Sequence, residues 1–138
     1  QNPIAKEFKM PRTRFFASLV FALSVVSASA LAAVKAPFTQ VAFEQALKSG
    51  DPILIEIHAD WCPTCKAQDA VMGPLQAKPQ FSKLRVFRVD FDSQKDVVKK
   101  FNARMQSTLI VFRGGAEVAR SVGETEANSL EMLLDKAL

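Results

Sequence analysis

The sequence predicts an α/β fold in which a central mixed β-sheet is flanked by helices on both faces. Short runs rich in apolar and β-branched residues alternate with amphipathic segments, and this order indicates βαβ units. Two of the runs, at 53–57 (ILIEI) and 108–112 (TLIVF), are apolar almost throughout, as strands buried on both faces are. A turn at Gly114-Gly115 joins the second run to its neighbour and predicts an antiparallel hairpin at the end of the sheet.

The first elements follow from the spacing of apolar residues and from the positions of glycine and proline. Phe38-Thr39 is expected to form a brief edge strand, and apolar residues on one face of 41–49 predict a helix after it. Gly50 suits the residue just past that helix, where a left-handed backbone is common. A helix should begin at Pro63, after the strand at 53–57, because the first helical turn does not need the missing N–H of proline.

The helix that begins at Pro63 is expected to reach about Met72 and to kink or break at Gly73-Pro74, with a second piece that ends before Pro79. The remaining segments complete the alternation of strands and helices. They are a strand at 84–90, a short helix at 94–101, the strand at 108–112, its hairpin partner at 117–122 and a closing helix at 124–138.

The motif Cys62-Pro63-Thr64-Cys65 lies where the strand at 53–57 passes into the next helix. A cysteine at the start of a helix sees the positive end of the helix dipole and unpaired backbone N–H groups, which favour the reactive thiolate form. Cys62 is therefore the expected attacking sulfur. Cys65, one turn later, is close enough to close a disulfide with Cys62 and so to resolve a mixed disulfide.

The use of cysteine favours catalysis over structural disulfides. Both cysteines of the 138-residue chain lie in this one motif, which leaves none to form a structural disulfide elsewhere. A conventional zinc site would need two further Cys or His ligands, and His58 is the only histidine. The sequence therefore predicts no metal and no cofactor.

The N-terminal part has the layout of a secretory leader. Residues 1–9 precede Met10 and are interpreted as an extension outside the folded domain, whereas 10–32 are predicted to be a signal peptide. Arg12 begins its basic part, and an uncharged stretch and small residues follow. The alternative is an uncleaved anchor, because about 20 uncharged residues could span a bilayer. We expect a periplasmic or otherwise exported protein, associated with the membrane only if the leader is retained, with its folded domain at 36–138.

The charge of the folded part argues against nucleic acid as a partner. The whole chain has a formal net charge of +4. From Ala33 onward, however, 14 Lys and Arg residues face 13 Asp and Glu residues, which leaves about +1. A surface this close to neutral gives no electrostatic attraction for a phosphate backbone.

The sequence resembles the thioredoxin superfamily over about 38–138. The resemblance is carried by the strand ILIEIHA at 53–59, the motif DWCPTCK at 60–66, the segment STLIVF at 107–112 followed by Gly114-Gly115, and Gly123 after the last strand. It implies a thioredoxin-like fold and an exported thiol-disulfide oxidoreductase that exchanges the Cys62–Cys65 pair with protein substrates, in the reducing direction. Its implied partners are disulfide or dithiol proteins and a redox donor or acceptor protein, and we expect it to act as a monomer.

The resemblance also implies roles for residues around the cysteines. Glu56 stands where these proteins carry a buried acid behind the second cysteine, so it is expected to move protons to and from Cys65. An apolar strand would favour the neutral form of that carboxyl and let it act as acid and base near neutral pH. The alternative is that Glu56 points to solvent. His58 replaces a common aromatic residue and is either a packing residue or a group that tunes Cys62 or joins the thiolates as a ligand.

Ser107 aligns with the proline of the family that faces the active site in the cis form. A cis bond before a residue other than proline costs about 2.5–4 kcal/mol, so the Gln106–Ser107 bond is expected to be trans. In relatives this proline shapes the substrate groove and keeps metals off the thiols. Gln106 and Ser107 are therefore counted with Trp61, Pro63 and Thr64 as residues that bind substrate or tune the cysteines.

The sequence leaves two other functions open. With the shielding proline replaced, the thiolates could bind a soft metal ion, or four of them across a dimer could hold an iron–sulfur cluster. The other alternative is a redox-inert binding module that keeps the fold, which the intact motif disfavours.

Overall fold

The computed structural model describes residues 33–138, and the predicted leader lies outside the described residues. A single five-stranded sheet forms the centre of this part of the chain, with the strand order β1-β3-β2-β4-β5. Its strands are β1 (Val34–Pro37), β2 (Ile53–His58), β3 (Arg85–Asp90), β4 (Thr108–Arg113) and β5 (Ala116–Val122). β3 pairs in parallel with β1 and β2, whereas β4 is antiparallel to β2 and β5. The predicted mixed sheet with its terminal hairpin is confirmed.

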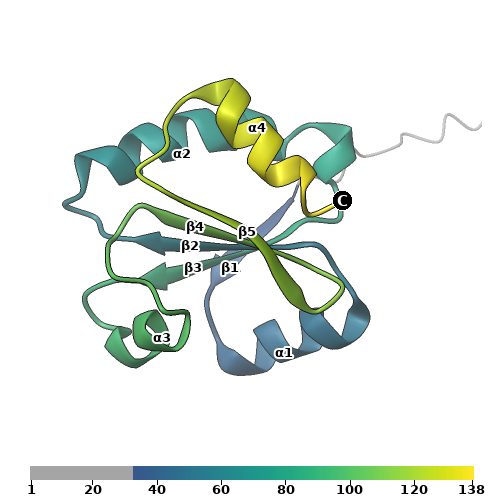
Figure 1. Ribbon diagram of the computed structural model, residues 1–138, viewed down its shortest axis with the longest axis horizontal. Helices are drawn as coiled ribbons and strands as arrows, with labels where there is room; N and C mark the ends of the chain where they lie inside the picture. The colour runs from purple at the N-terminus through teal and green to yellow at the C-terminus, as the bar shows by residue number, and fades with distance from the viewer. Residues whose placement is uncertain (1–32) are drawn as a thin grey trace, which may run out of the picture.

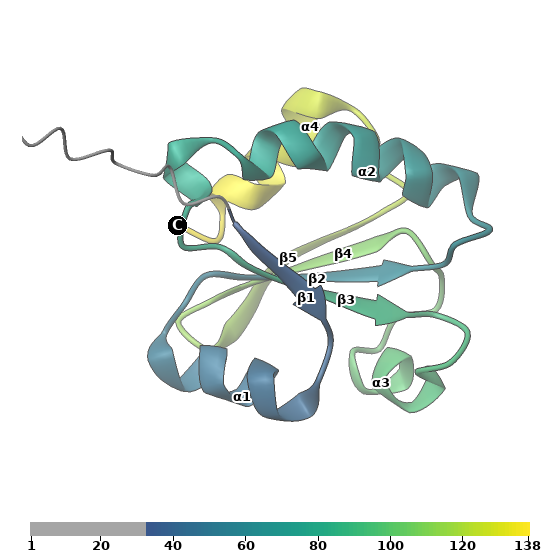
Figure 2. The same ribbon diagram turned by 180° about the vertical axis from the view of Figure 1, so that it is seen from behind.

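Helices cover both faces of the sheet. They are α1 (Gln40–Ser49), α2 (Pro63–Gln76), α3 (Lys95–Lys100) and α4 (Ala127–Asp135), together with a short 3-10 turn at Pro79–Phe81. α2 and α4 lie on one face, and α1 and α3 lie on the other (Figures 1 and 2). Within residues 33–138, every helix is too short or too polar to cross a membrane.

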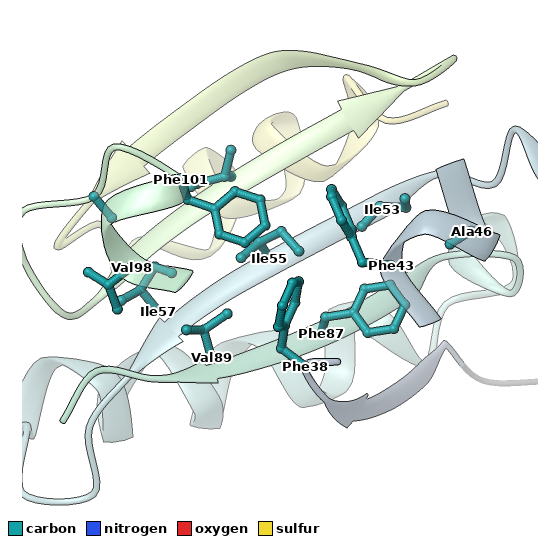
Figure 3. Close-up of a cluster of buried hydrophobic side chains, with 12 residues drawn as sticks. Phe38, Phe43, Ala46, Ile53, Ile55, Ile57, Phe87, Val89, Val98 and Phe101 are labelled. Carbon is teal, nitrogen blue, oxygen red and sulfur yellow. The ribbon is translucent and has the colours of Figure 1, made fainter. Parts of the chain in front are cut away.

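The two faces of the sheet bury different cores. The face under α1 and α3 holds a cluster rich in phenylalanine, in which the isoleucines of β2 pack against aromatic rings (Figure 3). The face under α2 and α4 holds an aliphatic cluster that includes Leu54, Met72 and Leu130. Because side chains alternate along a strand, the three central strands β2, β3 and β4 contribute to both clusters.

The face under α2 changes character along the strands. Near their starts, Leu54 of β2 and Val86 of β3 are fully buried in the aliphatic cluster. One pleat further on, Glu56 lies opposite Arg88 in the parallel register, and His58 then lies at the end of β2. The carboxyl ends of β2 and β3 therefore place polar and ionisable side chains beneath the first turns of α2.

Two local predictions were wrong. Phe38-Thr39 is not the edge strand: β1 ends at Pro37, and the Thr39 hydroxyl instead accepts a hydrogen bond from the backbone N–H of Ala42 and caps α1. Residues 34–37 of β1 thus join the sheet ahead of the expected domain start at 36. The second error concerns α2, which runs unbroken through Pro74 to Gln76.

The position of Pro74 explains why α2 continues. This residue lies in the last turn, so its missing N–H and its ring disturb the helix only near the end. The next residue, Leu75, is buried in the aliphatic cluster, and Gln76 is buried with its amide against Glu56. These tertiary contacts outweigh the local preference of a Gly-Pro pair to end a helix.

Candidate active site

The cysteine motif occupies the start of α2, as the sequence predicts. Cys62 is the N-cap residue, with an extended backbone, and Pro63 is the first helical residue. The backbone N–H of Cys65 donates a 3.0 Å hydrogen bond to Cys62 Sγ. Such a bond, together with the positive end of the helix dipole, favours negative charge on the Cys62 sulfur. Both cysteines are free thiols and each is only 1% exposed.

Cys65 differs chemically from Cys62. Burial, reinforced by the neighbouring Cys62 side chain, raises the pKa of the Cys65 thiol to about 11. Cys65 therefore holds its proton near neutral pH. It must lose that proton before it can attack, because only the thiolate is nucleophilic.

Glu56 lies in the interior, but its surroundings are not the apolar ones expected from the strand sequence. Its carboxylate is 6% exposed and 2.8 Å from Lys35 Nζ. Arg88 donates to Glu56 Oε2 from both Nε and Nη2 at 3.2 Å, and Gln76 Nε2 donates to Oε1 at 3.2 Å. The alternative that Glu56 points to solvent is excluded. Two cations and an amide contact its oxygens, so the expectation of an apolar environment was wrong.

Asp69 is a further acidic residue at the site, which the sequence analysis did not select. It lies on α2 one turn after Cys65 and contacts Lys35 at 3.2 Å and Arg88. Its second oxygen, Oδ2, is 3.2 Å from His58 Nε2. Glu56 and Asp69 thus share two cations, and Asp69 extends this network to His58. The carboxylate accepts, so His58 Nε2 is assigned as the donor.

The cations lower the pKa of Asp69. Burial alone would raise it, but Lys35 and then Arg88 outweigh burial. Because the pKa of Asp69 in the folded chain lies below the unfolded value of about 4, its contribution to stability is complete above about pH 4. That contribution is lost as the pH falls through the lower folded-state pKa.

We therefore expect the urea midpoint to fall on acidification below about pH 4, and to fall less steeply in Asp69→Asn. Asp96→Asn is the matched control, because Asp96 is an exposed residue of α3 on the opposite face. The control should keep the acid dependence of the parent chain. If the urea midpoint of Asp69→Asn falls with acid as steeply as that of the parent chain, the role given to these ion pairs is contradicted.

The segment around Ser107 is held without a cis bond. Residues 33–138 contain no cis peptide bond, so the Gln106–Ser107 bond is trans, as expected. Ser107 is buried and adopts a left-handed backbone with φ of 57°. Its carbonyl oxygen accepts hydrogen bonds from Gly123 N at 2.9 Å and from Gln68 Nε2 at 3.1 Å. Gln68 also donates to Glu124 O at 2.9 Å.

Gln68 therefore connects the cysteine helix to the two loops that approach it. Gln68 was not among the predicted site residues. A signal was present, because Gln68 lies three positions after Cys65 and so shares the buried face of α2. A polar residue on a buried helix face needs hydrogen-bond partners. Here the partners are backbone carbonyls, which residue types do not reveal.

The other predicted residues surround the motif. Trp61 is 58% exposed, and its indole Nε1 donates a 2.7 Å hydrogen bond to Asp92 Oδ2. Pro63 is exposed, while Thr64 and Gln106 are half-buried. Among residues 33–138, no group of three or more Cys, His, Asp or Glu side chains is arranged to hold a metal ion.

Two cavities near the cysteine motif share His58 as a lining residue. A small internal cavity of about 10 Å³ is lined by Cys65, Glu56, His58 and Asp69, among others. A larger, open pocket of about 310 Å³ lies beside β1 and β3 and is lined by residues that include His58, Asp60 and Arg88.

A free dithiol at a helix start, above a buried carboxylate on a mixed sheet, defines a thiol-disulfide oxidoreductase. Comparison with known proteins agrees with this class. The sequence model of the family named Thioredoxin matches residues 34–136, and the chain belongs to the thioredoxin family. Proteins of this family act on protein disulfides and receive electrons from reductants.

Curated relatives and a solved structure support the assignment. Thioredoxin of Pseudomonas aeruginosa is 33% identical over 98 residues, which cover 70% of this chain and 90% of the relative. Thioredoxin of Chlamydia trachomatis is 34% identical over 98 residues, which cover 71% of this chain and 93% of the relative. The crystal structure of Trxlp from Edwardsiella tarda is 46% identical and superposes with a TM-score of 0.72, over 73% of this chain and 98% of that one.

Proposed function

We propose that this chain is an exported thiol-disulfide oxidoreductase that reduces disulfide bonds in protein substrates. The observation that carries the proposal is the unequal state of the two cysteines. Cys62 Sγ accepts a backbone hydrogen bond at the helix start, whereas Cys65 is a buried thiol whose pKa is raised to about 11. One sulfur is thereby prepared to attack a substrate and the other to resolve the product.

The proposed cycle has two displacement steps. The Cys62 thiolate attacks one sulfur of the substrate disulfide and expels the other as a thiolate, which leaves a mixed disulfide. Cys65 then gives up its proton and attacks Cys62 Sγ, which forms the Cys62–Cys65 disulfide and releases the second substrate thiolate. Glu56 is proposed to assist the proton step, as the family resemblance implies.

The substrate is proposed to contact the exposed side chains around the motif. Trp61, Met105 and Val122 are large apolar residues that are 58%, 53% and 54% exposed. Val122 pairs with Thr108 in the sheet, next to the Gln106-Ser107 segment. We propose that Ser107 occupies the position of the family's proline and that Gln106 and Ser107 border the bound peptide.

The reducing direction is proposed from the family resemblance. A strongly oxidising pair stabilises its reduced form, typically with a very acidic attacking cysteine, so the reduction potential of the Cys62–Cys65 pair distinguishes the two directions. Export is supported by the basic and then uncharged pattern of residues 10–32, and a donor protein outside the cytoplasm would then have to return electrons.

The reduction potential tests the direction of the reaction. We would equilibrate the protein in thiol buffers and follow the fluorescence of Trp61, the only tryptophan, which lies next to Cys62. A potential of about −230 to −270 mV is expected for a reductant fed by a dedicated donor. A value of about −120 to −180 mV would instead show an oxidant or isomerase, and no reversible transition would refute thiol-disulfide exchange altogether.

A further inference from the structure

His58 lies between the buried thiol and the open pocket. It is the one residue that lines both the internal cavity next to Cys65 and the 310 Å³ pocket beside β1 and β3. The internal cavity, at about 10 Å³, is close to the volume that one water molecule requires. Of the residues that line the cavity next to Cys65, only His58 also lines the open pocket.

The Glu56 carboxylate is heavily engaged by other groups. Its two oxygens accept from Gln76 and Arg88, and Lys35 Nζ lies 2.8 Å from Oε2. A proton added to Glu56 would weaken its interactions with both cations, which costs free energy in a buried site. A second proton acceptor beside Cys65 would relieve this cost.

His58 has the surroundings of a proton acceptor. Its Nε2 is 3.2 Å from Asp69 Oδ2, and its Nδ1 is 3.6 Å from Asp60 Oδ1. The second distance is too long for a good hydrogen bond, so Nδ1 remains open to exchange with water. An imidazolium at this position would have a carboxylate on each side.

Both signs of charge surround the ring. The ionisable groups that face His58 or line the same two cavities are Glu56 on β2, Asp60 after β2, Cys65 and Asp69 on α2, Arg88 and Asp90 on β3, and Lys35 on β1. Two of these carboxylates lie close to the ring nitrogens, Asp69 at 3.2 Å and Asp60 at 3.6 Å.

We propose that His58 accepts the proton of Cys65 during the resolving step and passes it to water in the open pocket, with Asp69 as the residue that positions the imidazole. The inference rests on the proposed disulfide reduction and adds a second proton route beside Glu56. In this step the Cys65 proton moves by way of the internal cavity to His58 Nδ1, the ring nitrogen that carries no proton when Nε2 donates to Asp69. The Cys65 electron pair forms the bond to Cys62, and the bonding pair of the mixed disulfide leaves with the substrate thiolate.

The test separates the two steps of the cycle. Reduced full-length protein is mixed with dithiobis(nitrobenzoic acid), which releases one coloured thiolate when Cys62 attacks and a second when Cys65 resolves. In His58→Phe and His58→Gln we expect the first phase to stay unchanged. The second phase should slow by at least about tenfold and lose the part of its pH dependence that an imidazole acceptor supplies.

Two aspartate variants test the positioning role. Asp69→Asn keeps a hydrogen-bonding side chain but removes the charge, so the second phase should slow several-fold while its pH profile shifts. Asp96→Asn makes the same charge change on the other face of the sheet and should behave as the parent chain does. Circular dichroism verifies that each variant is folded. If His58→Phe does not fold, the comparison uses His58→Gln.

The outcomes distinguish the inference from the function on which it rests. A parent chain without a fast first phase would refute the proposed attack by Cys62. A normal first phase in every variant, followed by second phases with the rate and pH profile of the parent, would overturn the role of His58 and leave disulfide exchange intact.

Discussion

Cys62→Ser is expected to abolish disulfide reduction, whereas Cys65→Ser is expected to stop the reaction at a mixed disulfide. A serine at position 62 cannot provide the attacking thiolate, although the helix start would still favour negative charge there. With serine at position 65, Cys62 can still attack, but nothing within the chain displaces the bound substrate. Turnover is lost in both variants, and only one of them holds its substrate covalently.

The two serine variants act as controls for each other in one experiment. Each is incubated with an extract of the native host, and adducts are compared by electrophoresis with and without reductant. Cys65→Ser should give reductant-sensitive adducts that Cys62→Ser lacks. If Cys65→Ser captures no protein, or if both variants capture the same proteins, the assigned order of attack fails.

Phe43→Ala is expected to lower the free energy of unfolding by about 3–5 kcal/mol. Phe43 projects from α1 into the phenylalanine cluster and is 6% exposed (Figure 3). Its ring centroid lies 5.4 to 6.2 Å from those of Phe38, Phe87, Phe101 and Phe112. Truncation removes these aromatic contacts and leaves a cavity that a rigid sheet cannot close.

Urea unfolding measures this loss, and Val41→Ala is the matched control. Val41 lies on the same helix and is 66% exposed, so its truncation should change the stability by no more than about 0.5 kcal/mol. The reduction potential of Cys62–Cys65 should be the same in both variants as in the parent chain, because Phe43 lies across the sheet from α2. A loss in Phe43→Ala no larger than in Val41→Ala would show that the cluster is not the main stabilising core on this face.

Sequence reasoning worked best where one short segment carries its own physical signal. The apolar run of β2 and the cysteine motif after it predicted a strand that passes into a helix, and the structure places Cys62 at that helix start. Gly50 likewise adopts the left-handed conformation past α1 that its position predicts. Local rules failed for α2 at Pro74, since buried contacts of Leu75 and Gln76 decided where the helix ends.

The charged network could not be predicted in the same way. Lys35 and Arg88 lie 34 and 19 residues from Asp69, and they meet it only because β1, β3 and α2 come together in the fold. Had the parallel register of β2 and β3 been known, it would have placed Arg88 opposite Glu56. Nothing in the local sequence of Asp69 distinguishes it from a solvated helix residue, so its contact with His58 became visible only with the structure.

The division of the sheet into two unlike faces has a consequence for how this chain can change. Substitutions in the phenylalanine cluster alter how well the domain survives heat or denaturant, while the groups that set its chemistry lie across the sheet beneath α2. Because distant sites with no shared partners contribute almost additively, the two properties can be adjusted one at a time. Substitutions, whether engineered or selected, could therefore first raise the stability of the domain and later change the reduction potential of its cysteine pair.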